Sequence, residues 1–315
     1  PSMPTPVPPS SPSAATASAA TSMPAAARTA LPVAPRKPRG FWSRACRHRS
    51  FMLGLVLTVL LLATAALSYL WTPWPPYDLN IRGKLQLPSA AHWLGTDNLG
   101  RDVLSQIMVG ARNSITVGVI AVGIGVIGGV LLGMLAATRG GWIETVIMRV
   151  TDFTLAFPAI LLAIMLTAAL GAGIVNAIVA IGIANIPIFT RLTRATARSM
   201  WSREFVLAAR TCGKSDWRIA FEHVLPNIVS VIVVQATIEF AIAILAEAAL
   251  SYLGLGTQPP DASWGRMLSE AQTLMFQAPR LAIYPGIAIA LAVLGLNLLG
   301  DGLRDLLDPR LARRR

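Results

Sequence analysis

Six long apolar stretches constrain this chain more than any other feature. They lie at about 51–71, 113–137, 153–171, 174–192, 227–254 and 281–300. A helix needs about 20 mainly apolar residues to cross a bilayer. Only 13% of the residues are charged, whereas soluble domains carry roughly 25%. The sequence therefore predicts an all-α integral membrane protein with about six transmembrane helices.

The basic residues predict how these spans are oriented. The segments assigned to the cytoplasm hold 21 of the 27 Lys and Arg residues, and they are 1–50, 138–152, 191–226 and 301–315. This bias agrees with the positive-inside rule and places both termini in the cytoplasm. We expect a disordered basic tail over 1–50, because it is rich in Pro, Ala and Ser. We expect an uncleaved first span at 51–71 and a second cytoplasmic tail at 301–315.

The outer segment 72–112 is long enough to form its own structure. Asp97 is a candidate N-cap, and apolar residues follow it with helical spacing at Leu99, Val103, Leu104, Ile107, Met108 and Ala111. The pattern predicts an amphipathic helix that lies on the membrane domain formed by residues 113–300.

The predicted cytoplasmic loop 193–226 is the most informative stretch. It is expected to form two short helices, the first ending at Gly213, a residue type suited to a helix end. Ser215 or Asp216 can cap the second helix, which should end before Pro226. One face of the first helix is expected to carry small and apolar residues, which suits a groove on another protein: Phe205, Ala208, Ala209 and Cys212.

This loop resembles the cytoplasmic motif of ABC-importer permeases. The short form of that motif is Glu-Ala-Ala, three residues, Gly and a later Leu-Pro, and Leu207 stands here in place of its Glu. The fuller peptide-importer form is matched at Glu204, Phe205, Val206, Ala208, Ala209, Arg210, Gly213, His223, Leu225, Pro226 and Asn227. The resemblance implies an ATPase-coupling loop made of Glu204, Phe205, Ala208, Ala209, Gly213, Asp216, Arg218, His223 and Pro226.

Further motifs in the same order are similar to the second permease of dipeptide and oligopeptide importers. They are His92-Trp-Leu-Gly-Thr-Asp97, Ala156-Phe157-Pro158, Leu250-Ser-Tyr-Leu-Gly-Leu-Gly256 and Gly300-Asp301-Gly302. The resemblance implies the type I ABC-importer permease fold in a bacterial inner membrane. It also implies a homologous second permease, two ATPase subunits and an extracytoplasmic substrate-binding protein. Short peptides, glutathione or nickel chelates are the implied solutes.

Two acidic residues, Glu239 and Glu247, lie within the fifth span. Charge in hydrocarbon is costly and usually faces a cavity or a partner. These residues therefore either line the translocation path or have a structural role. An ion-coupled secondary transporter would use them with Asp152 as a proton relay, but such transporters carry repeated broken helices, and no internal repeat is visible. A scaffold protein would leave the cytoplasmic loop unexplained.

Several other features favour structure over chemistry. Gly123, Gly125 and Gly128 match a dinucleotide fingerprint but lie inside an apolar span. The spacings Gly125/Gly129 and Gly129/Gly133 instead suit close helix packing in lipid. No GxxxxGK[ST] motif occurs, so ATP hydrolysis is assigned to separate chains and no cofactor is expected. The net charge of +12 lies beside the spans rather than on an aromatic-studded face, which argues against nucleic acid. The scattered His and Cys residues predict no metal site.

Overall fold

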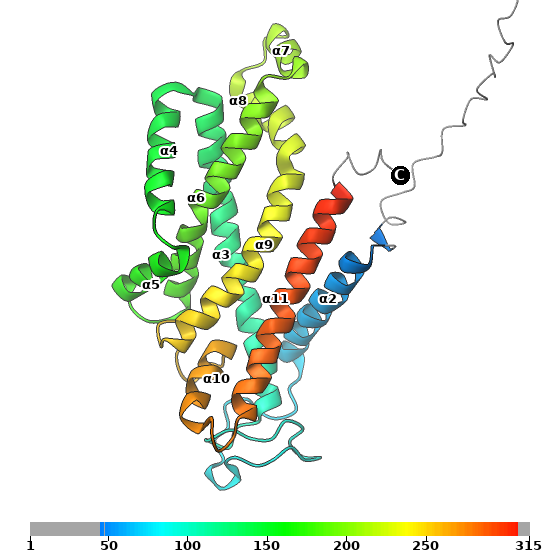
Figure 1. Ribbon diagram of the computed structural model, residues 1–315, viewed down its shortest axis with the longest axis vertical. Coiled ribbons are helices and arrows are strands. Elements are labelled where there is room, and N and C mark those ends of the chain that lie inside the picture. Colours follow the sequence, from blue (N-terminus) through cyan, green and yellow to red (C-terminus); the bar gives the residue numbers. More distant parts are fainter. Residues whose placement is uncertain (1–44, 47, 308–315) are drawn as a thin grey trace, which may run out of the picture. The chain divides into compact units, whose positions relative to one another are not determined.

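The computed structural model describes residues 45–46 and 48–307, and this part of the chain is a bundle of helices (Figure 1). The expected tail over 1–50 and the end of the tail over 301–315 therefore lie mostly outside the described residues. The longer helices are α2 (Arg49–Leu70), α3 (Val103–Arg139), α4 (Gly141–Leu155), α5 (Ala159–Leu170), α6 (Ile174–Trp201), α9 (Leu225–Tyr252) and α11 (Arg280–Leu307). Shorter ones are α7 (Glu204–Thr211), α8 (Asp216–Ile219) and α10 (Trp264–Ala271).

The expected all-α membrane fold is confirmed. Five helices or continuous helical runs are long and apolar enough to cross a membrane, namely α2, α3, α6, the run Asp216–Tyr252 and α11. The expected third span at 153–171 is not one straight helix. Instead α4 and α5 meet at an 89° bend and together could form a sixth, broken span. Pro158 explains the break, because proline lacks the N–H that would continue a helix.

The helix expected in the outer segment is continuous with the second span. Both are parts of α3, which runs for 37 residues from Val103. The predicted N-cap at Asp97 is wrong, since Asp102 accepts the backbone N–H of Ser105 at 2.8 Å and caps the helix. Asp97 instead closes the preceding turn by accepting the backbone N–H groups of Leu99 and Arg101, both at 2.8 Å.

The predicted close packing at glycine is confirmed where α3 meets α6. A Cβ atom at Gly129 would lie 2.4 Å from the Phe189 Cβ atom and 2.8 Å from the Ile186 carbonyl oxygen. A Cβ atom at Gly125 would lie 2.7 Å from the Asn185 Cβ atom. These contacts are shorter than side chains tolerate, so the small residues allow the two backbones to approach closely.

Two boundaries of the predicted loop 193–226 differ from the structure. Helix α6 continues past residue 192 to Trp201, so the loop begins later than expected. The second short helix also does not end before Pro226. It passes through a π-helical turn, η2 (Ala220–Val224), directly into α9. At position 226 proline occupies the first turn of α9, where a missing N–H is tolerated.

The two ends of the bundle carry different elements. Helices α7 and α8 project at one end, and α10 with the segment 71–102 lies at the opposite end (Figure 1). Helix α11 packs against both α2 and α9, while α6 packs against α3, α5 and α9. In this arrangement the rest of the bundle does not cover the outer side of α7 and α8.

Candidate functional site

Helices α7 and α8, with the turn between them and η2, form a compact head over residues 203–224. Helix α7 ends at Thr211, and Gly213 has a positive φ of 78°. The predicted stop at Gly213 is confirmed, because glycine adopts this left-handed conformation without a Cβ clash. Ser215 is the N-cap residue of α8.

The packing of the head corrects one residue of the free face predicted for α7, because Phe205, Ala208 and Cys212 are exposed and Ala209 is not. Ala209, predicted on the exposed face, is buried together with Val206 against the core residues Ile219, Ala220 and Val224. The face turned away from the core carries Glu204, Ala208 and Thr211, all exposed. These residues follow the spacing i, i+4 and i+7 that defines one helix face. A small residue, Ala208, therefore stands at the centre of the free face.

Ion pairs join the parts of the head. Glu222 accepts hydrogen bonds from Lys214 at 2.6 Å and from Arg218 at 2.6 Å. His223 Nε2 lies 3.0 Å from Lys214 Nζ, so both residues of η2 contact the α7–α8 turn. Arg210 and Asp216 form a longer pair at 3.3 Å. Exposed pairs of this kind contribute little stability singly, but as a network they set the geometry of the head.

Aromatic contacts attach the head to the neighbouring helix ends. The guanidinium of Arg210 lies 5.2 Å from the ring centre of Trp201, at the end of α6. The guanidinium of Arg139, at the end of α3, lies 6.0 Å from the ring of Trp217. Trp217 in turn stacks on Phe221 with ring centres 6.1 Å apart. A displacement of the head would therefore be transmitted to the ends of α3 and α6 as well as to α9.

Glu247 lies near the α10 end of α9, and its side chain is fully buried within the bundle. Its carboxylate accepts hydrogen bonds from three hydroxyls, those of Ser251 at 2.7 Å, Thr257 at 3.3 Å and Ser114 at 3.3 Å. The hydroxyls come from α9, from the loop before α10 and from α3. One carboxylate thus holds three segments together.

Glu239 lies two turns earlier in α9 and is 2% exposed. Gln235 donates to one of its carboxylate oxygens at 2.9 Å, whereas the other oxygen, Oε2, has no hydrogen-bond partner among the described residues. An unpaired buried carboxylate oxygen is costly. Of the two acidic residues in this helix, Glu239 is the one whose hydrogen bonding is incomplete.

A buried ionic cluster at the α10 end was missed by sequence reasoning. Arg101 binds Asp97 at 2.6 Å and Glu270 of α10 at 2.6 Å, and Gln106 also donates to Asp97 at 2.8 Å. Burial lowers the pKa of Arg101, but the two carboxylates outweigh it and hold the pKa above its ordinary value. The i, i+4 spacing of Asp97 and Arg101 was a usable signal, while the partner 169 residues away was not.

Asp152 does not join the two acidic residues of α9. It pairs with Arg191 of α6 at 2.5 Å, and both side chains are about half exposed. Glu144, earlier in α4, pairs with Arg194 and Arg198 of α6. These ion pairs attach α4 to α6. Among the described residues no hydrogen bond links Asp152 to Glu239 or Glu247, so the structure gives no support to a proton relay through the three.

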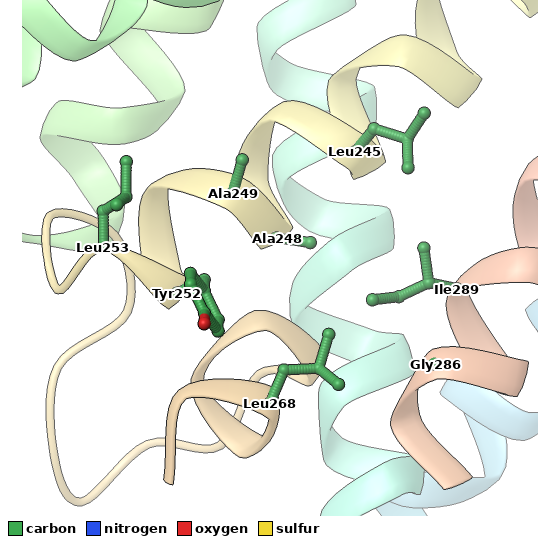
Figure 2. Close-up of a pocket in the computed structure, with 8 residues that line it drawn as sticks. All are labelled: Leu245, Ala248, Ala249, Tyr252, Leu253, Leu268, Gly286 and Ile289. Carbon is green, nitrogen blue, oxygen red and sulfur yellow. The ribbon is translucent and has the colours of Figure 1, made fainter. Parts of the chain in front are cut away.

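An open apolar hollow of about 500 Å³ lies between α9, α10 and α11 (Figure 2). It is lined by Leu245, Ala248, Ala249, Tyr252, Leu253, Leu268, Gly286 and Ile289. Among the residues that the structure describes, no charged side chain lines this hollow to bind the ammonium or carboxylate of a peptide. It suits hydrocarbon, from lipid or from another helix.

Helices of this length and composition are typical of an integral membrane protein. Residues 129–313 match the family of binding-protein-dependent transport system inner membrane components. The chain belongs to this family and is an ABC-importer permease subunit of the inner membrane.

Named relatives cover nearly the whole chain. It is 44% identical to the dipeptide transport system permease protein DppC of Alkalihalophilus pseudofirmus, over 84% of this chain and 87% of that protein. It is 43% identical to the glutathione transport system permease protein GsiD of Pectobacterium atrosepticum, over 87% of this chain and 91% of that protein. These matches confirm the predicted peptide and glutathione importer permease family.

One solved structure shares the fold. A chain of the inward-facing MetNI methionine ABC transporter aligns with a TM-score of 0.55 at 17% identity. The alignment covers 64% of this chain and 97% of the solved chain. This likeness supports the predicted importer permease fold, and it carries no information on the solute.

Proposed function

We propose that this chain forms one half of the translocation path for short peptides or glutathione and couples it to ATP hydrolysis through the α7–α8 head. The other half is a homologous permease, two ATPases bind at the head end, and a binding protein delivers the solute at the α10 end. Both termini then lie in the cytoplasm, as the distribution of Lys and Arg predicts. The names of the relatives support the solute class.

The free face of α7 is the single observation that carries the coupling role. Ala208 and Thr211 are small and exposed, while Phe205 and Leu207 beside them are 40% and 56% exposed. A helix whose small residues face outward can lie close to a partner surface, and the flanking apolar side chains supply contact area. The ion pairs of Glu222 join η2 to α8 and to the α7–α8 turn.

The test is Ala208→Trp in the assembled importer. A Trp here fills the free face without entering the core, so we expect the ATPases to be lost on purification and ATP-driven uptake to fall at least tenfold. Ala169→Trp, also at an exposed alanine but on α5 away from the head (Figure 1), is the matched control and should leave both unchanged. Normal uptake with bound ATPases in the Ala208 variant would refute the coupling role.

The solute is tested separately from the coupling. Uptake of a labelled dipeptide and of labelled glutathione is compared in cells with and without this permease, each in competition with the other unlabelled solute. We expect uptake of at least one to depend on the chain. Loss of neither on deletion would refute the proposed solute class while leaving the coupling role intact.

A further inference from the structure

The π-helical turn η2 lies where the head joins the membrane bundle. The chain runs without interruption from α8 through Ala220–Val224 into α9. Within η2 the backbone N–H of Leu225 donates to the carbonyl of Ala220, five residues earlier, instead of the four of an α-helix. Wide turns of this kind are rare and frequently mark functional positions inside longer helices.

The sequence explains why the turn is wide. Pro226 has no N–H for the carbonyl of Glu222, and its ring would clash with that carbonyl in a regular α-helix. The extra residue in the turn relieves this clash. The Asn227 side-chain amide donates to the His223 carbonyl at 2.6 Å, so it satisfies a carbonyl inside the turn. The Leu225-Pro226-Asn227 run therefore encodes the π turn.

The η2 turn is held by contacts on both of its sides, and one hydrophobic cluster runs from Val206 and Ile219 of the head to Ile228 of α9. Toward the head, Glu222 and His223 are attached to Lys214 by polar contacts, so η2 follows any movement of the α7–α8 turn. Toward the membrane, Ile228 and Ile232 of α9 are buried among the transmembrane helices. The wide turn thus lies between the ion pairs of the head and the buried part of α9.

We propose that the π turn Ala220–Val224, set by Pro226 and Asn227, is the joint at which the α7–α8 head rotates relative to α9 during the transport cycle. The inference rests on the proposed coupling function and goes beyond it by locating where the movement is absorbed. Ala220 and Val224 are buried at the pivot. Phe221 and Glu222, between them, contact the head through Trp217 and Lys214.

The first test removes the joint while keeping both helices in phase. Deletion of Phe221 combined with Pro226→Ala converts the wide turn into a regular α-turn, since Leu225 then lies four residues after Ala220. We expect the ATPases to bind and hydrolyse ATP, but the solute moved per ATP to fall at least tenfold. Phe221→Ala, which removes only the ring stacked on Trp217, is the control and should keep this ratio within twofold. A wild-type ratio in the deletion variant would overturn the proposal.

The second test uses the intact turn and does not depend on how the deletion variant folds. Spin labels are attached to cysteines introduced by Ser215→Cys in the head and Val233→Cys in α9, and both positions are exposed. The native Cys46 and Cys212 are first changed to Ser, so that only the introduced cysteines react. In the reconstituted complex we expect the distance between the labels to differ between the nucleotide-free and ATP-bound states. An unchanged distance while the ATPases remain bound would refute the joint and leave the coupling function standing. Normal uptake with bound ATPases in the Ala208→Trp variant would instead refute the coupling function itself.

Discussion

Replacing Glu247 by an apolar or an amide side chain separates a structural role from a role in the translocation path. In Glu247→Leu the hydroxyls of Ser114, Ser251 and Thr257 lose their common acceptor. A buried polar group left without its partner costs about 1–3 kcal/mol. Ser114 and Ser251 can turn toward carbonyls of their own helices, which recovers part of this cost. We therefore expect a loss of about 2–4 kcal/mol in stability.

Glu247→Gln is the matched variant, because it keeps shape and hydrogen bonding but removes any charge. The amide oxygen can accept from Ser251 and Thr257, and the amide nitrogen can donate to Ser114, whose hydroxyl both donates and accepts. If the residue is purely structural, the Gln variant should lie within about 1 kcal/mol of the wild type and transport normally.

The assay measures folded subunit during an SDS titration in mixed micelles, with uptake in proteoliposomes as the second readout. A Leu variant as stable as the wild type would refute the structural role. A Gln variant that is stable but loses uptake would show that the negative charge acts in transport, as the sequence allowed.

Two further predictions concern the interior of the bundle. Gly129→Ala places a Cβ atom 2.4 Å from that of Phe189 and should destabilise the subunit by about 1–3 kcal/mol in the same titration. The control Gly123→Ala places its Cβ atom where nothing lies within 4 Å, so it should be neutral or slightly stabilising. Equal losses of stability in the two variants would contradict the packing of α3 on α6. We propose that Glu239 lies beside the path, so Glu239→Gln should lower uptake in proteoliposomes without loss of assembly, and unchanged uptake of several solutes would refute this role.

The parts of the fold that depend on local patterns were predictable from sequence. Long apolar runs gave the spans, and Gly213 gave the end of α7, because each signal lies within a few residues of the feature it determines. Gly129 was placed correctly in a helix contact, since small residues in an apolar span have few other uses.

The parts that depend on long-range contacts were not predictable. Ala209 was assigned to the free face of α7 because its spacing fits the apolar stripe. Which side of that stripe is covered depends on Ile219 and Val224, contributed by a different segment. The N-cap of α3 moved from Asp97 to Asp102 because Asp97 is occupied by the turn and by Arg101. Asp102, which caps the helix, was not predicted as a cap.

The polar contacts at the two ends of the bundle differ in their burial, and this difference indicates which end rearranges more easily. At the α10 end, Asp97, Arg101 and Glu247 are buried and fully engaged, so loops and helix ends there are held in one arrangement. At the head end, the ion pairs of Glu222 are exposed, and exposed pairs exchange readily with water. Buried networks resist rearrangement, whereas exposed ones allow it at little cost. Movement driven by ATP should therefore begin at the head and meet resistance at the α10 end, where we propose that the solute enters.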